Sequence, residues 1–134
     1  MKVIVDTDVW SEAFRKRGKK SLYVTELKTL IEESRAELLG VVKMEILCGI
    51  RERLVFDRIA KSLSPFPTRA MTSEVFVTAS EFFNTCRSKG IQGSNNDFLI
   101  CAASALWGLP ILTKNQDFKR YQKHLPITMA SFRK

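Results

Sequence analysis

The sequence predicts an α/β fold with a mainly parallel central sheet and helices on both faces. Three observations lead to this prediction. Short apolar runs rich in β-branched residues alternate along the chain with longer segments whose apolar residues recur at helical spacing. Acidic residues stand where apolar stretches give way to polar sequence, as happens at the carboxyl ends of parallel strands. A length of 134 residues suits one domain, so we expect residues 1–134 to form a single unit.

The first half of the chain is expected to contribute two strands. Residues 2–5 are apolar and β-branched after Lys2, which is typical of a buried parallel strand, and residues 37–42 indicate the next strand. Asp8 can cap the first helix, which would begin near Val9. Further helices are expected over residues 21–34, around Glu45 and over 51–62.

The second half begins with a loop at residues 64–68, where two prolines exclude regular pairing. A long helix should start at Thr72 or Ser73 and end at Gly90. The remaining elements are expected in this order: a turn and cap at 93–96, a helix from Asp97 to Trp107 stopped by Gly108, a strand at 110–113, a short helix at 117–123 and an edge strand at 127–130.

Four acidic residues form the candidate site. They are Asp6, Glu45, Asp97 and Asp117, and each lies beside an apolar stretch. Carboxylates that converge at one edge of a sheet repel one another unless a cation is present, and hard oxygen ligands suit Mg²⁺ or Mn²⁺. The pattern therefore predicts a site for one or two such ions.

Each acid also has a purely structural interpretation. Asp6 can cap the turn after its strand, and Asp117 can cap the short helix that follows it. Asp97 can simply place negative charge at a helix N-terminus. Glu45 can lie on a solvated helix face.

Composition limits the classes of protein that remain. The formal net charge is +8 at pH 7 although the candidate site is acidic, which indicates a polyanionic substrate, while solubility alone is the simpler explanation. No apolar run reaches about 18 residues and no secretory signal is recognisable, so we expect a cytoplasmic protein without membrane segments. Cys48, Cys86 and Cys101 are widely spaced, which favours buried reduced thiols.

Four motifs together resemble the PIN-domain family, and within it the VapC toxin branch of VapBC toxin–antitoxin systems. They are Val5-Asp6-Thr7-Asp8-Val9, Glu45-Ile46-Leu47-Cys48-Gly49, Asn96-Asp97-Phe98-Leu99-Ile100-Cys101-Ala102-Ala103 and Thr113-Lys114-Asn115-Gln116-Asp117-Phe118. No motif is specific alone, but four in this order span essentially the whole chain. Two positions depart from the family pattern: Asp8 replaces a small polar residue and either adds a ligand or caps a helix, and Cys101 replaces Ala.

The resemblance implies a PIN-like three-layer sandwich and a single nuclease domain. It also implies a metal-dependent ribonuclease that is usually a homodimer and is inhibited by a small antitoxin protein. Metal ions would activate water and stabilise charge on the scissile phosphate, so no side-chain general base is needed. Thr7 and Thr113 would orient carboxylates, whereas Asn115 either joins the site or bonds its own turn.

Basic residues are the candidates for holding RNA. They are Arg15, Lys16, Arg17, Lys119, Arg120 and Lys123, although Lys and Arg also suit a helix end or a solvated loop. The one histidine, His124, is expected on the surface. Trp10 and Trp107 are expected in the core or in a dimer interface rather than as base-stacking platforms.

Other functions fit the sequence less well. A response-regulator receiver lacks a convincing phospho-accepting Asp, since Asp57 lies in a helical context. No dinucleotide-binding or P-loop glycine motif is present. Two alternatives stay open: a stand-alone PIN RNA-processing nuclease, and a PIN-like module that binds RNA or a partner without cutting.

Overall fold

Three short parallel strands form the centre of the computed structural model, which describes residues 1–15 and 18–132. The strands are β1 (Val3–Val5), β2 (Ala36–Glu37) and β3 (Ile111–Leu112), in the order β2–β1–β3. Ile4 in β1 pairs with Glu37 on one side and with Ile111 on the other. All of β1 is buried, which explains why it contains only Val and Ile.

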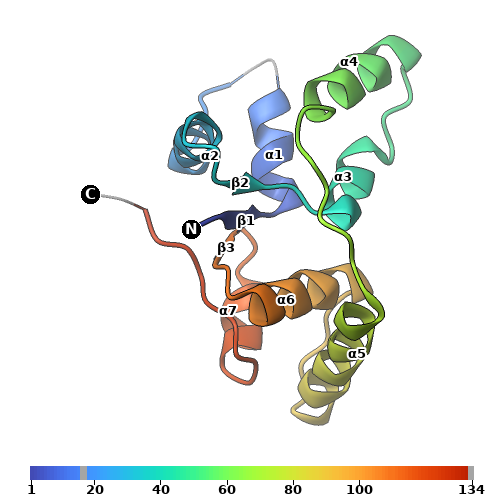
Figure 1. Ribbon diagram of the computed structural model, residues 1–134, viewed down its shortest axis with the longest axis vertical. Coiled ribbons are helices and arrows are strands. Elements are labelled where there is room, and N and C mark those ends of the chain that lie inside the picture. The colour runs from blue at the N-terminus through green and yellow to red at the C-terminus, as the bar shows by residue number, and fades with distance from the viewer. Residues whose placement is uncertain (16–17, 133–134) are drawn as a thin grey trace.

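Helices cover both faces of the sheet and give the molecule three layers (Figure 1). Helices α1 (Thr7–Phe14) and α2 (Leu22–Glu32) lie on one side, and α6 (Asn95–Trp107) and α7 (Asp117–Gln122) lie on the other. Helix α3 (Gly40–Leu47) packs against α1 and α4 (Arg53–Leu63), and α5 (Ser73–Ser88) packs along α6. The α/β class and the three-layer arrangement predicted from the sequence are thus confirmed.

One apolar core joins the sheet to the helices. Ile4, Leu38 and Ile100 are fully buried in it. Trp10 is 2% exposed and its indole Nε1 donates to the Val5 carbonyl oxygen at 3.1 Å, so it is a core residue as expected. Among the described residues, no helix has both the length and the apolarity needed to span a bilayer.

The first helix starts earlier than the sequence predicted. Its N-cap is Asp6, whose side chain accepts a hydrogen bond from the Thr7 amide, and α1 begins at Thr7 rather than near Val9. The prediction that Asp8 caps this helix was therefore wrong. Asp8 lies in the first turn of α1 and its carboxylate turns toward β3 and the residues that follow it.

The second strand is shorter than predicted. Pairing stops at Glu37, and Val41 and Val42 lie in α3 instead of in a strand. A run of buried apolar residues has no polar face to reveal its period, so a buried helix start and a buried strand look alike in sequence. This correction places Glu45 in the second turn of a helix that begins at Gly40.

The later elements follow the predictions closely. Ser94 caps α6 by accepting from the Asp97 amide at 3.0 Å, so the helix starts at Asn95, and Gly108 ends it with a positive φ of 67°. The edge strand expected at 127–130 is reduced to a single parallel bridge between Ile111 and Met129. Of the three cysteines expected to be buried, Cys86 and Cys101 are, whereas Cys48 is exposed.

Candidate metal-binding active site

Asp6 is the first residue after β1, and the fold buries its carboxylate. The residue is 6% exposed. Its Oδ1 accepts from the Thr7 amide and its Oδ2 from the Thr113 hydroxyl, both at 2.7 Å. Burial raises the pKa of Asp6 to about 6, and the negative charges of Asp8 and Asp97 act in the same direction against the two hydrogen bonds. Asp6 is therefore a carboxylate that a nearby cation would strongly stabilise.

Asp97 lies in the first turn of α6. The Tyr121 hydroxyl donates to Asp97 Oδ2 at 2.8 Å. Burial raises the pKa of Asp97, and the charges of Glu45 and Asp117 raise it further, while the hydrogen bonds from Tyr121 and Ser94 lower it. The four predicted acids thus act on one another across three different helices and the end of β1.

Two threonine hydroxyls orient carboxylates in this site. The Thr7 hydroxyl donates to Glu45 Oε1 at 2.8 Å, which ties α3 to the residue beside Asp6. The Thr113 hydroxyl, at the end of β3, holds Asp6 and also accepts from the Asn115 amide at 3.0 Å. Hydroxyl contacts of this kind fix carboxylate rotamers.

Asp117 lies further out than the other acids. Its side chain is 50% exposed and lies 3.6 Å from Arg120 Nη1. The Asn115 side-chain oxygen accepts from the Asp117 amide at 2.9 Å, so Asn115 bonds its own turn, which was one of its two predicted roles. The loop of residues 113–117 therefore carries Asp117 on an internally bonded turn.

Two contributors were missed by the sequence reasoning. Tyr121 is fully buried and touches Asp97, but a tyrosine in a short helix gives no local sign of such a partner. Lys114 donates its backbone amide to both carboxylate oxygens of Asp8, at 3.1 and 3.3 Å. Asp8 is thus engaged with the residue after Thr113, and burial raises its pKa.

The donor chemistry of the site fits a hard divalent cation. Asp6, Glu45, Asp97 and Asp117 offer only carboxylate oxygens, and their mutual repulsion is the interaction that Mg²⁺ or Mn²⁺ would relieve. Within residues 1–15 and 18–132, no three His, Cys, Asp or Glu side chains are grouped so that they could hold an ion as they stand. Asp6, Glu45 and Asp97 instead each accept from a hydroxyl group.

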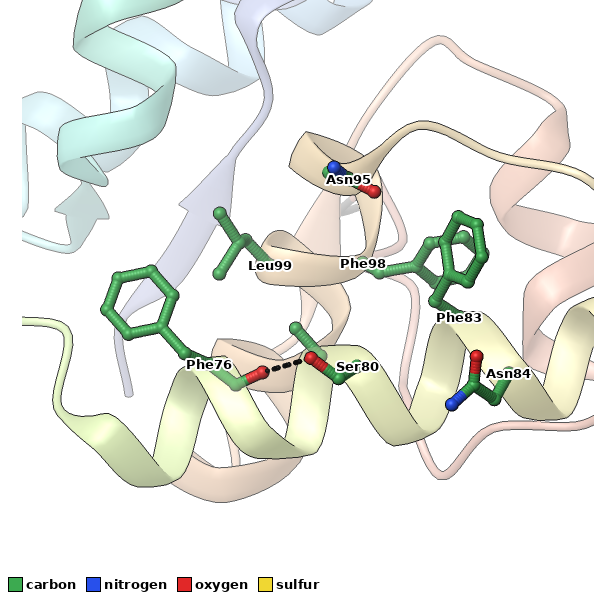
Figure 2. A pocket seen from close by; sticks show the side chains of 8 residues that line it. Phe76, Ser80, Phe83, Asn84, Asn95, Phe98 and Leu99 are labelled. Atoms are coloured by element: carbon green, nitrogen blue, oxygen red, sulfur yellow. Dashed lines mark hydrogen bonds between the residues drawn. The ribbon is translucent and has the colours of Figure 1, made fainter.

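A groove between α5 and α6 uses the helix that carries Asp97 but has a different character. Its volume is about 440 Å³, and Phe76 and Phe83 of α5 line it together with Asn95 and Leu99 of α6 (Figure 2). Asn95 and Leu99 flank Asp97 in the sequence. The lining is largely aromatic and aliphatic, so the carboxylate chemistry belongs to the strand ends and not to this groove.

The predicted RNA-binding residues lie on the surface where they are described. Arg15, Lys119, Arg120 and Lys123 are exposed, and the last three follow Asp117 along and just beyond α7. Lys16 and Arg17 lie outside the described residues. His124 is exposed, as expected of a surface residue.

Comparisons with known proteins find relatives of this chain over nearly its whole length. A family model described as PIN domain matches residues 3–124. "VapC ribonuclease Mb1587" of Mycobacterium bovis and "Ribonuclease VapC11" of Mycobacterium tuberculosis are each 27% identical over 135 residues, which covers 98% of this chain and 99% of theirs.

Two solved structures show the same fold. FitAcB from Neisseria gonorrhoeae has a TM-score of 0.77 at 17% identity, with 96% of both chains covered. VapBC2 from Rickettsia felis, bound to a DNA fragment from its promoter, has a TM-score of 0.75 at 18% identity and covers 99% of this chain and 100% of its own.

Proposed function

This chain belongs to the PIN domain family, and from that premise we propose that it is a metal-dependent endoribonuclease that hydrolyses RNA phosphodiester bonds. The observation that carries the proposal is the convergence of four acids: Asp97 feels the charges of Glu45 and Asp117, and Asp6, directly after β1, feels that of Asp97. Relatives of nearly the same length are named ribonucleases. A binding module would gain nothing from this costly clustering of carboxylates.

The four acids would hold one or two ions of Mg²⁺ or Mn²⁺. A bound ion of this kind supplies an activated water and stabilises the charge that develops on the scissile phosphate. The chain itself orients the ligands: Thr113 holds Asp6, Thr7 holds Glu45 and Tyr121 holds Asp97. Because Asp6, Glu45 and Asp97 are each held by a separate hydroxyl, these three proposed ligands have defined carboxylate rotamers.

The proposed setting is the cytoplasm, where the chain would act as the toxin of a type II toxin–antitoxin pair. Its partner would be a cognate small antitoxin protein, and the active form would be a homodimer. The VapC names of the relatives support this role, and the net charge of +8 supports RNA as substrate. Lys119, Arg120 and Lys123, which follow Asp117 in the sequence, would contact phosphates beside the acids.

The test is cleavage of a defined RNA by the purified protein. Wild type should cut with Mg²⁺ or Mn²⁺ and stop when a chelator is in excess. Asp6→Asn and Asp97→Asn should remain folded yet cut at least about 100-fold more slowly, since each removes a charged metal ligand. Asp57→Asn is the matched control, because Asp57 is an exposed acid on α4 paired only with Arg53 among its described contacts. Undiminished cleavage in chelator would refute the metal mechanism.

Two other functions remain distinguishable by experiment. A PIN-like module that only binds RNA or a partner would show no metal-dependent cleavage. A stand-alone RNA-processing nuclease would cleave in the same way, but its expression would be harmless and no neighbouring gene product would bind it.

A further inference from the structure

Glu12 is a buried acid that the candidate site does not use. It lies in the second turn of α1 and is 4% exposed. Its Oε2 accepts from the Ser21 amide, and its Oε1 accepts from the Ser21 hydroxyl, both at 2.7 Å. Its Oε1 also accepts from Lys114 Nζ at 3.0 Å. A buried carboxylate with this many donors has a defined structural task.

The contacts of Glu12 with Arg15 and Ser21 bring together the two described ends of the segment between α1 and α2. We use the name basic connection for Arg15, Lys19 and Lys20, which are the described basic residues between α1 and α2. Both ends of this connection meet at Glu12: Arg15 Nη2 lies 3.8 Å from Oε2, and Ser21 directly follows the connection. The Lys20 ammonium also donates to the Arg15 carbonyl oxygen. Glu12 therefore holds the two described ends of the basic connection close to each other.

The second contact reaches the active-site loop. Lys114 follows Thr113, which holds Asp6, and the same loop leads to Asp117. Its ammonium is bound by Glu12 and its amide by Asp8, one helical turn apart on α1. The loop is also bound to α1 through Thr113 and Asp8, and the contacts of Glu12 link the described ends of the basic connection to the same loop.

Glu12 keeps its charge throughout the physiological range. Hydrogen bonds from the Ser21 hydroxyl and amide, and then from Lys114, lower the pKa of Glu12 to about 2. If Glu12 only neutralised its basic neighbours, it would weaken RNA binding, because its charge offsets those of Lys114 and Arg15. If Glu12 positions the basic connection, it strengthens RNA binding. The direction in which KM changes when Glu12 is replaced therefore distinguishes the two roles.

We propose that Glu12 is a positioning residue that holds the basic connection beside the 113–117 loop, so that RNA phosphates bound by the connection enter the acidic site in one register. This inference rests on the proposed ribonuclease function. It predicts that replacing Glu12 weakens substrate binding and leaves the rate of the chemical step nearly unchanged.

The principal test compares Glu12→Gln with Glu32→Gln in steady-state cleavage of the same RNA. Both changes raise the net charge by one, and Glu32 is an exposed residue of α2. We expect Glu12→Gln to raise KM at least about 5-fold with kcat within about 2-fold of wild type, and Glu32→Gln to leave KM unchanged or lower it. An unchanged or lower KM for Glu12→Gln would overturn the proposal. Absence of cleavage by wild type would instead reject the ribonuclease function itself.

A second pair of variants tests whether the effect passes through Lys114. Lys114→Met leaves the contacts between Glu12 and Ser21 intact, so it also carries the test if Glu12→Gln is poorly folded. Its control is Lys28→Met, an exposed lysine on α2. We expect Lys114→Met to raise KM. The double variant, which also carries Glu12→Gln, should have a KM no higher than that of Glu12→Gln alone. Simple additivity of the two effects would contradict positioning through this contact.

A measurement independent of activity completes the test. Amide hydrogen exchange, followed by NMR, should be faster at Ser21 in Glu12→Gln because its acceptor is weakened, and faster at Lys114 although that amide bonds to Asp8. Both amides should exchange as in wild type in Glu32→Gln. Unchanged protection at Lys114 would show that Glu12 does not reach the loop.

Discussion

Asp6 and Asp97 are the residues whose chemistry is most dependent on their surroundings. Both have raised pKa values for the same first cause, burial, and both feel the charge of other acids in the site. The Thr113 and Tyr121 hydroxyls compensate only in part. The folded protein therefore holds these charges at a free-energy cost that a bound cation would offset.

The pH dependence of stability should reveal this cost at Asp6. Its pKa is 3.8 in an unfolded chain and about 6 in the folded protein, so the folded form retains the proton to higher pH. Stability contributed by Asp6 is therefore lost as pH rises from about 4 to about 6, and the loss corresponds to about 3 kcal/mol at neutral pH.

Urea unfolding of metal-free wild type and Asp6→Asn at pH 4 and pH 7 isolates this effect. The free energy of unfolding of Asp6→Asn, relative to that of wild type, should be higher at pH 7 than at pH 4. Excess Mg²⁺ should abolish this difference at pH 7, because it stabilises wild type. Asp57→Asn serves as the control. A stability difference between Asp6→Asn and wild type that does not change with pH would contradict the raised pKa.

The hydroxyl of Tyr121 gives a second prediction at this scale. Tyr121→Phe removes one oxygen atom from a buried ring and leaves Asp97 without its 2.8 Å donor. Because the donor orients a proposed ligand, Mg²⁺ affinity should fall by about 10-fold. Isothermal titration measures this directly, with Tyr23→Phe on α2 as the control. Equal Mg²⁺ affinity in Tyr121→Phe and wild type would show that the hydroxyl serves only packing.

At the scale of elements, the connection between α4 and α5 ties the two halves of the molecule together. Phe66 packs edge-on against Trp10 of α1, with ring centroids 5.1 Å apart. Arg69 stacks 4.2 Å from the Trp107 ring of α6, and its Nε lies 3.2 Å from Glu37 Oε1 in β2. This connection thus contacts both helical layers and the edge of the sheet.

Removing Arg69 should destabilise the fold without changing the site. Glu37 is 3% exposed, and Arg69→Met would leave it with Lys2, at 3.7 Å, as its remaining described cation. We expect a loss of about 1–3 kcal/mol, because the buried Glu37 carboxylate loses its nearer cation while Lys2 remains beside it. Denaturant unfolding measures the loss, and Arg53→Met on exposed α4 is the control. Adding Glu37→Gln should recover part of the stability, and no recovery would indicate that the ring contact dominates.

At the scale of the whole molecule, an acidic site lies in a strongly basic protein. The net charge of +8 attracts polyanions from a distance, while the carboxylates bind cations at one place. A protein of this kind that cleaves cellular RNA must be kept inactive until it is needed. The proposed antitoxin would do so by placing a basic side chain among the carboxylates, in competition with metal.

Expression in cells tests this proposal. The chain alone should arrest growth, co-expression with the protein encoded beside it should restore growth, and Asp6→Asn should be harmless while still binding that partner. Colony counts after induction and co-purification provide the two measurements. Harmless expression of an active enzyme that no neighbouring gene product binds would favour the stand-alone RNA-processing nuclease.

The sequence by itself determined those features that depend on near neighbours along the chain. The apolar run before Asp6 predicted β1, helical spacing predicted α2 and α5, and Gly108 marked the end of α6 because glycine readily adopts positive φ. The order of elements also predicted that the four acids lie at one edge of the sheet, since parallel strands end on the same side.

Only the tertiary structure decided which partner each polar group has. It ended β2 at Glu37, made Asp6 rather than Asp8 the cap of α1, and brought Tyr121 to Asp97. It also joined Glu12 to Lys114, which lie 102 residues apart. Local sequence limits backbone conformation, but a carboxylate bonds to whichever donor the packed core leaves within about 3 Å, and that choice is made by the whole fold.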